Sequence, residues 1–327
     1  MPPPSIAVAI CTHNRAKDTL ECLDALYPQV KDGRGALLVV DSASDGPDKE
    51  IIASTVARYP GLRLIRLEKA GLSLARTAAL EASDAEWLAY LDDDAIPHHD
   101  WFENLSEVVT KVPADTAAIG GRILPLFPGS EPRPLRPLHK MYVSLNDTLG
   151  DHDGTEGLEL IGANSCYRRA PVLQLGGFAT GVGRNGTNLL SGEDVMVMRK
   201  LREAGWRIRY NGAFCVGHKI MPERLTSAWV RKRAYWEGIT TLRMARLLDD
   251  PGYWTMVAKA FVKTPASGLM VFSNQPEKEW DLRFAFNCGL MAEAFWYMPQ
   301  QVISAWMAPK NVGGVNLADG AQRVSNR

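Results

Sequence analysis

The sequence WLAYLDDD at residues 87–94 joins a short apolar run to three consecutive aspartates. An apolar run of this length is typical of a strand that is buried on both faces of a sheet. Three adjacent carboxylates repel one another, so a positive group has to neutralise them. Mg²⁺ and Mn²⁺ prefer oxygen ligands, and Mg²⁺ is commonly held by one or two carboxylates together with substrate phosphates. The segment predicts a strand that ends at a metal site, or alternatively an exposed acidic turn that caps a helix.

Strand and helix patterns alternate on both sides of this segment. Apolar runs predict strands over 6–10, 36–40, 62–67, 86–91 and 206–210, and helical spacing fills 15–26, 49–58, 72–82 and 99–111. Strands that alternate with helices predict an α/β fold with a mostly parallel twisted sheet flanked by helices. The proline-rich stretch 125–137 cannot be a regular helix and is expected to be a loop.

Polar clusters follow three of the predicted strands, at 11–15, 41–45 and 92–94. In open α/β sheets, ligands bind outside the carboxyl ends of the strands, so the three clusters should converge on one cleft. Asp41 is suited to accept hydrogen bonds from a base or ribose, or alternatively to form a turn. Asn14 and Arg15 begin a predicted helix, where the free N–H groups favour anions, although Asn14 there also suits capping.

Two further residues suit phosphate binding. Gly71 permits close backbone approach at the start of the helix over 72–82. Arg76 in that helix suits a phosphate or an aspartate partner, with ordinary surface ion pairing as the alternative. Glu193 and Asp194 open another amphipathic helix that ends before Gly205, and acidic residues there also stabilise the helix dipole.

Composition narrows the classes of function. The chain has 327 residues with 37 basic and 37 acidic side chains, so a general nucleic-acid binder is disfavoured. Five scattered cysteines without CxxC spacing favour a reducing compartment, and the N-terminal segment does not read as a secretory signal. We expect a cytoplasmic protein, either free or peripheral on the cytoplasmic face of the membrane. The apolar stretch 284–307 is interrupted by polar residues and is expected to be a core or interfacial helix.

The motifs IAVAICTHNR, VVDSASDG, AGLSLARTAAL and LAYLDDDAIP follow one another over about residues 5–100. ANSCYRR, GEDVMVMRKLREAGWRIRY and GH extend the series to about residue 220. In order and spacing the series resembles glycosyltransferase family 2, which has the GT-A fold. The resemblance implies inverting transfer of a sugar from a nucleotide-sugar donor to the hydroxyl of a saccharide or lipid-linked acceptor. A UDP-sugar is the first expectation for the donor, and Mg²⁺ or Mn²⁺ is the expected cofactor. The usual setting is cell-surface or extracellular polysaccharide or glycolipid synthesis.

The resemblance also implies roles for individual residues. The nucleotide-binding positions are Thr12, Asn14, Arg15, Asp41, Gly71, Arg76, Asp92 and the variable middle position Asp93. Asp94 is the direct metal ligand, with Asp92 nearer the ribose and His218 as a third ligand or a structural histidine. Asp194, next to Glu193, is the general base. The family more often has Asn where this chain has Thr77, and RKRAYW at 231–236 replaces the family's QxxRW-type motif, which argues against processive synthesis.

The chain is expected to divide into a catalytic domain over 1–220 and a helical extension over 221–327. Basic and aromatic residues interleave from Arg224 to Trp236, a pattern that suits diphosphate, a lipid phosphate, an anionic membrane surface or a solvated helix face. The GxGxxG at 181–186 follows no strand and is expected to be an acceptor-side loop rather than a dinucleotide site. A sugar-nucleotide pyrophosphorylase and an inactive nucleotide-binding scaffold are the alternatives.

Overall fold

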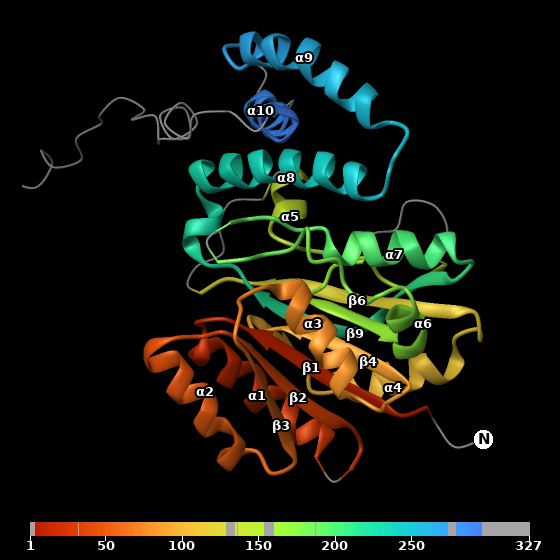
Figure 1. The fold of residues 1–327 in the computed structure, drawn as a ribbon. Helices are drawn as coiled ribbons and strands as arrows, with labels where there is room; N and C mark the ends of the chain where they lie inside the picture. Colours follow the sequence, from red (N-terminus) through yellow and green to blue (C-terminus); the bar gives the residue numbers. More distant parts are fainter. Residues whose placement is uncertain are drawn as a thin grey trace, which may run out of the picture.

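The computed structural model describes residues 4–31, 33–128, 135, 137–153, 160–186, 188–273 and 279–295. Within them a central sheet carries helices on both faces, and a layer of helices from the C-terminal part lies over one side (Figure 1). The predicted α/β fold class is confirmed.

The first half of the sheet is parallel, in the order β3-β2-β1-β4. These strands are β1 (Ile6–Thr12), β2 (Ala36–Ser42), β3 (Leu62–Leu67) and β4 (Trp87–Asp92). Thr12 lies opposite Asp41, and Cys11 lies opposite Asp92. The register therefore brings the polar ends of β1, β2 and β4 to one edge, as expected for parallel strands that follow one another through helices.

The second half of the sheet is mixed. Its strands are β5 (Ala95–Pro97), β6 (Thr116–Leu126), β7 (Asp151–Asp153), β8 (Asn164–Arg168) and β9 (Arg207–Lys219). Strand β8 runs antiparallel between β4 and β6, whereas β6 and β9 are parallel to each other. Strand β9 continues to Lys219, well beyond the predicted strand over 206–210, so His218 lies within the strand, opposite Ala95 of β5. The pairing with β5 and β6 extends β9 beyond its apolar sequence run.

Helices cover both faces because strand residues alternate in direction. On β1, Val8 and Ile10 face α1, α2 and α4, whereas Ala7 and Ala9 face α3 and its neighbours. The first group is α1 (Ala16–Val30), α2 (Gly46–Arg58) and α4 (Trp101–Lys111); the second is α3 (Leu72–Ala82), α6 (Arg169–Gln174) and α7 (Glu193–Glu203). The small alanines on one side allow α3 to pack close to the sheet.

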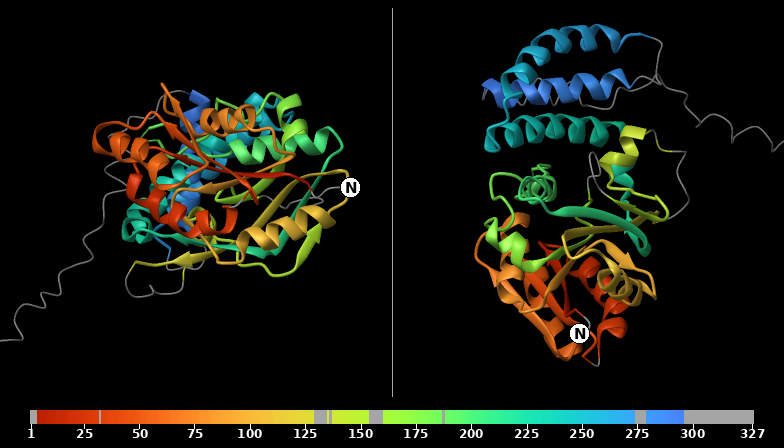
Figure 2. Two further views of the ribbon diagram at one scale, coloured as in Figure 1. Left: turned by 90° about the horizontal axis from the view of Figure 1, so that it is seen from below. Right: turned by 90° about the vertical axis from the view of Figure 1, so that its right-hand side faces the viewer.

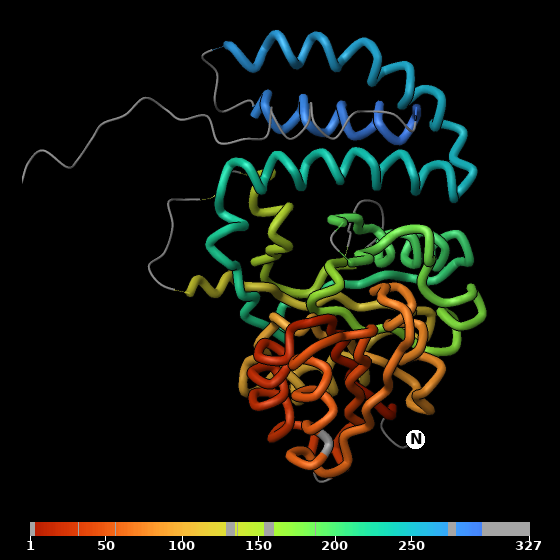
Figure 3. Tube along the Cα trace, turned by 60° about the vertical axis from the view of Figure 1, so that its left-hand side comes forward, coloured from red at the N-terminus to blue at the C-terminus, as the bar shows by residue number. Residues whose placement is uncertain are grey.

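The C-terminal part is helical, as predicted, and Figures 2 and 3 show it as a stack over the sheet domain. Its helices are α8 (Ser227–Leu247), α9 (Tyr253–Met270) and α10 (Trp280–Phe295), linked to the sheet by α5 (Pro137–Tyr142) and the short η1 (Pro222–Leu225). Helix α8 faces the sheet domain, α10 packs on α8, and α9 forms the outer layer (Figure 1). The proposed boundary at residue 220 stays a prediction.

The apolar stretch 284–307 is described only as far as Phe295, within α10, and its remainder lies outside the described residues. Several α10 side chains, including Leu282, Ala285 and Leu290, are buried against α8 or α9. No helix in the described ranges is both long enough and apolar enough to cross a bilayer.

Helices α8 and α10 touch through glycines. A Cβ atom on Gly289 would lie 1.9 Å from the carbonyl oxygen of Tyr235, and one on Gly238 would lie 2.0 Å from that of Phe286. Backbone atoms cannot move aside as a side chain can, so these glycines set the separation of the two helices.

We predict that Gly289→Ala lowers the free energy of unfolding by about 1–3 kcal/mol, because the added methyl forces α8 and α10 apart. Urea unfolding measures this change. Gly268→Ala is the matched control, because its Cβ would lie 3.1 Å from the Phe284 ring, which can shift. Equal stability of the two variants would contradict the proposed close packing.

Candidate active site

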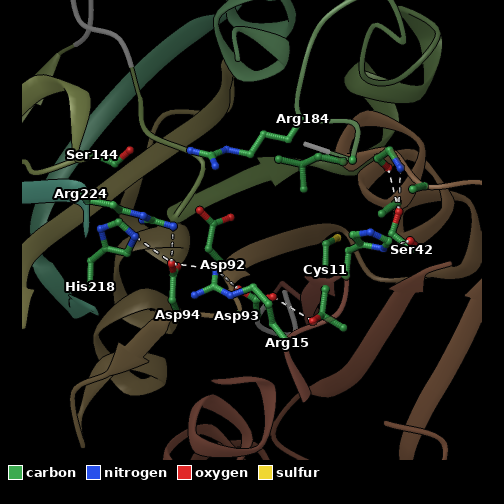
Figure 4. Close-up of a pocket in the computed structure, with 17 residues that line it drawn as sticks. Cys11, Arg15, Ser42, Asp92, Asp93, Asp94, Ser144, Arg184, His218 and Arg224 are labelled. Carbon is green, nitrogen blue, oxygen red and sulfur yellow. Dashed lines mark hydrogen bonds and ion pairs between the residues drawn. The ribbon is translucent and has the colours of Figure 1, made fainter. Parts of the chain in front are cut away.

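A pocket of about 230 Å³ lies at the carboxyl ends of β1, β2 and β4. His218, Arg224 and Asp94 lie at one end of it and Cys11 and Ser42 at the other, with Asp92 and Arg184 between them (Figure 4). Of the predicted site residues, those that line the pocket are Thr12, Arg15, Gly71, Asp92, Asp93, Asp94 and His218. The expected convergence of the strand ends on one cleft is therefore found.

The three aspartates at the end of β4 differ in their surroundings. The Asp92 side chain is about one-third exposed and faces the pocket, whereas Asp93 and Asp94 are buried. Asp93 accepts a hydrogen bond from the Thr12 hydroxyl at 2.8 Å and pairs with Arg15 at 2.9 Å. Burial raises the pKa of Asp93 to about 8, against the lowering effect of the Arg15 guanidinium.

Asp94 is held by three basic side chains. His218 Nε2 lies 3.2 Å from its Oδ1, while Arg15 and Arg224 reach its Oδ2 at 2.9 and 3.3 Å. Burial by itself raises the pKa of Asp94, but these charges outweigh it and hold the pKa well below the ordinary value. Asp94 is therefore ionised in this arrangement at neutral pH.

His218 and Asp94 fit a divalent cation. The other ring nitrogen, Nδ1, lies 3.1 Å from the Val143 carbonyl, which can only accept, so Nδ1 carries a proton. Nε2 lies 3.2 Å from a carboxylate oxygen that can only accept, so either a proton on Nε2 or a metal ion between the two atoms satisfies this contact. No group of three or more His, Cys, Asp or Glu side chains that could hold a metal ion occurs in the described residues. The structure therefore does not bring Asp92 together with Asp94 and His218 as a set of three ligands. Asp94 and His218 alone suit an ion whose other ligands come from substrate phosphate and water.

Arg76 joins the aspartate turn to helix α7. Its guanidinium lies 2.7 Å from Glu193 Oε1 and 3.2 Å from Asp92 Oδ1, and it lies over the rings of Tyr90 and Phe178. Burial opposes its charge, but Glu193 and Asp92 raise its pKa above the ordinary value. Arg76 and Glu193 do not line the pocket; they form the buried wall behind Asp92.

Asp194 lies beside this wall and outside the pocket lining. Its two carboxylate oxygens accept hydrogen bonds from the backbone N–H groups of Gly162 and Val195, at 2.9 and 2.8 Å. Burial raises the pKa of Asp194, while Arg76 lowers it. Asp194 is half-buried, whereas Glu193 is buried and Glu193 Oε2 has no hydrogen-bond partner within the described part of the chain. Burial, above all, raises the pKa of Glu193 to about 7.

Asp41 and Asn14 support the loops around the pocket and do not line it. Asp41 is buried, accepts from the Ser44 N–H at 2.9 Å and pairs with Arg66. Asn14 accepts from the Asp45 N–H at 2.8 Å and so ties the loop after β1 to the loop after β2. Their predicted contacts with the nucleotide stay predictions.

Several pocket residues are not among the predicted site residues. Those with a polar or ionisable side chain are Cys11, His13, Ser42, Ser144, Arg184 and Arg224. The sequence marks Arg224 only as one of several basic residues, and it marks the loop of Arg184 only as an acceptor-side loop. The arginine in a glycine-rich loop just before Glu193 is the signal that could have identified Arg184. Burial and the nearby charges of Arg224 and Arg233 lower the pKa of Arg184. The Arg184 guanidinium therefore lies close to other positive groups.

Comparison with known proteins gives the same assignment as the motifs. The family model described as glycosyl transferase family 2 matches residues 7–176. The glucosyl-dolichyl phosphate glucuronosyltransferase of Haloferax volcanii is 26% identical over 71% of this chain and 75% of its own length. The succinoglycan biosynthesis protein ExoM of Rhizobium meliloti is 25% identical over 73% of this chain and 74% of its own.

A solved structure shares the fold. It is the mannosyltransferase PcManGT from Pyrobaculum calidifontis in complex with GDP-Man and Mn²⁺, with a TM-score of 0.58 and 18% identity over 90% of this chain and 88% of that one. Because the family match covers more than half of the 327 residues and agrees with the ordered motifs, the chain belongs to glycosyl transferase family 2 and is a glycosyltransferase.

Proposed function

We propose that the protein transfers a sugar, with inversion, from a nucleotide-sugar donor to an acceptor hydroxyl, and that a divalent ion, Mg²⁺ or Mn²⁺, assists. A UDP-sugar is the first expectation for the donor. The observation that carries the proposal is the Asp94–His218 pair, in which Nε2 and a carboxylate oxygen lie 3.2 Å apart in a pocket that Asp92, Arg15, Arg184 and Arg224 also line.

The basic residues of the pocket suit the donor diphosphate. Arg184 has no ion-pair partner among the residues that the structure describes, and it lies across the pocket from Asp92 (Figure 4). A guanidinium binds phosphate oxygens through two parallel hydrogen bonds. The bound ion would stabilise the charge that develops on the leaving diphosphate. Arg184 and Arg224 would add to that stabilisation through fixed positive charge.

Asp194 suits the role of general base better than Glu193. In an inverting transfer the acceptor oxygen attacks the anomeric carbon opposite the leaving nucleotide, the glycosidic bond to the diphosphate breaks, and the hydroxyl proton passes to a base. Asp194 is partly accessible and each of its oxygens keeps a free lone pair, whereas Glu193 is enclosed and bound to Arg76. We therefore assign Glu193 to positioning Arg76, and proton transfer to Asp194.

The names of two relatives support the proposed setting. One is named for acting on a dolichyl-phosphate-linked glucose and another for succinoglycan biosynthesis. They support an acceptor that is a saccharide or a lipid-linked saccharide, in cell-surface or extracellular polysaccharide or glycolipid synthesis.

We predict that Asp194→Asn lowers kcat by about 10²–10⁴-fold, because the amide cannot take the acceptor proton. Donor binding, measured by calorimetry, should change little. Glu203→Gln at the other end of α7 removes an exposed carboxylate of the same helix and serves as the control. Normal turnover of Asp194→Asn would show that the base lies elsewhere.

Donor binding is predicted to depend on the divalent ion. Without it, Asp92 and Asp94 repel the diphosphate, so chelation should weaken UDP binding by at least about tenfold. In the presence of UDP, added Mn²⁺ should raise the melting temperature of the wild type but not that of Asp94→Asn. Asp115→Asn, which changes an exposed carboxylate, is the control and should respond to Mn²⁺ like the wild type. A screen of UDP-, dTDP- and GDP-sugars in the same assay identifies the donor. Equal affinity with and without Mn²⁺ would exclude the metal role.

Removing Arg76 is predicted to leave an unpaired buried carboxylate. Arg76→Met should lower the free energy of unfolding by about 3–5 kcal/mol. In this variant the pKa of Glu193, which burial already raises, rises further because the Arg76 charge is gone. The folded state then becomes less stable relative to the unfolded state as the pH increases and Glu193 has to ionise. The loss should therefore be larger at about pH 9 than at about pH 5.

Urea unfolding at the two pH values measures this difference. The control is Arg199→Met on α7, which removes a half-exposed arginine and should cost less than about 1 kcal/mol. A pH-independent loss in Arg76→Met would contradict the proposed pairing with Glu193.

A further inference from the structure

Helix α9 carries an exposed apolar face on the outside of the molecule. Trp254 is 75% exposed, Val262 73% and Leu269 76%, and Phe261 and Phe272 are also exposed. Large apolar side chains usually lie inside a protein, and a row of exposed ones marks an interaction surface.

These residues share one side of the helix. At 3.6 residues per turn, Trp254, Phe261, Val262 and Leu269 fall within an arc of about 100°. The buried residues of α9, Val257, Ala260 and Ser267, lie on a different side, against α10 and α8. Phe261 packs edge-on against the Phe295 ring of α10 at one margin of the row, with ring centroids 5.0 Å apart. Trp254, Val262 and Leu269 carry the apolar row away from α10, and we call the whole row the outer face.

The charged side chains of α9 have one sign. Lys259 and Lys263 are exposed, and neither has an ion-pair partner within the described part of the chain. Lys259 lies beside the outer face, whereas Lys263 lies toward the side of α9 that lines a cavity with α8 and α10. The sequence from Tyr253 to Phe272 contains no aspartate or glutamate. The chain as a whole has no net charge, so this local excess of positive charge is a property of the surface and not of the composition.

The neighbouring helix α8 does not offer such a surface. Its basic and aromatic residues were one reason to expect contact with phosphates or a membrane. Tyr235 and Arg233 are buried, and Arg233 donates a hydrogen bond to Ser191. Helix α8 lies between the sheet domain and α10, whereas α9 is the outermost layer (Figures 1 and 3).

We propose that the outer face of α9 docks the enzyme on the surface of an anionic lipid bilayer. A helix that lies in the membrane interface has tryptophan, phenylalanine and leucine on its apolar face, with lysines beside it. Each lysine near an anionic surface adds attraction, and α9 has no acidic side chain to oppose it. A second protein copy would need acidic groups opposite the lysines, and the outer face supplies none for self-association.

Vesicle flotation with the full-length protein tests the proposal. Wild-type protein should float with vesicles of phosphatidylcholine and phosphatidylglycerol. Trp254→Ser combined with Leu269→Ser should weaken binding by at least about tenfold, because two exposed apolar side chains no longer enter the lipid. Leu149→Ser, which removes a leucine that is 66% exposed on the sheet domain, is the control and should bind like wild type.

A charge-reversed variant tests the electrostatic part. Lys259→Glu with Lys263→Glu should bind these vesicles about tenfold more weakly than wild type. Unchanged melting temperatures, and unchanged thermal shifts with UDP and Mn²⁺, show that the variants are folded and that the donor site is intact.

Three results would overturn the proposal. They are wild-type protein that stays in solution, equal flotation of the wild type and the Trp254/Leu269 variant, and equal flotation of the charge-reversed variant. A concentration-dependent dimer that the Trp254/Leu269 variant abolishes, without flotation of the wild type, would assign the face to a second copy instead. None of these results bears on the proposed transferase activity.

Discussion

The site depends on one buried guanidinium. Arg76 is 2% exposed, and a buried charge is tolerated only where it is paired and hydrogen-bonded. Its partners come from two segments that are far apart in the sequence, Asp92 at the end of β4 and Glu193 at the start of α7. Gly162 leaves space for it, since a Cβ there would lie 2.1 Å from Arg76 Nη2. The same glycine donates its N–H to Asp194, so Arg76 and the proposed base are positioned by one piece of backbone.

This arrangement separates two kinds of chemistry. On one side of Arg76, Asp94 and His218 line the pocket with Asp92 and suit an ion and the phosphates of the donor. On the other side, Asp194 lies at the start of α7 with backbone N–H groups on its oxygens. An inverting transfer needs the leaving group and the base on opposite faces of the reacting carbon. A single arginine between two acidic clusters keeps the clusters from repelling each other while it holds them at fixed separation.

Much of this follows from sequence, and some of it does not. The alternation of apolar runs with helical patterns predicts the parallel half of the sheet. The polar clusters at the ends of those runs predict the cleft, and the parallel register does bring these ends together. The antiparallel insertion of β8 between β4 and β6 does not follow, because it depends on pairing across long sequence separations. Arg76 is predicted to meet a phosphate or an aspartate, and the aspartate partner is found; its stronger contact with Glu193, 117 residues away, has no local sequence signal. Thr77, which departs from the family pattern, accepts a hydrogen bond from the Phe178 N–H and so supports the ring beside Arg76.

The claim that the acidic cluster and His218 hold a divalent ion together with the donor diphosphate can be tested by electron–nuclear double resonance on the Mn²⁺ complex with UDP. The account predicts a nitrogen coupling that disappears in His218→Ala and a phosphorus coupling from the diphosphate in the same spectrum. A Mn²⁺ signal with phosphorus coupling but no protein nitrogen, or with neither, would contradict the account.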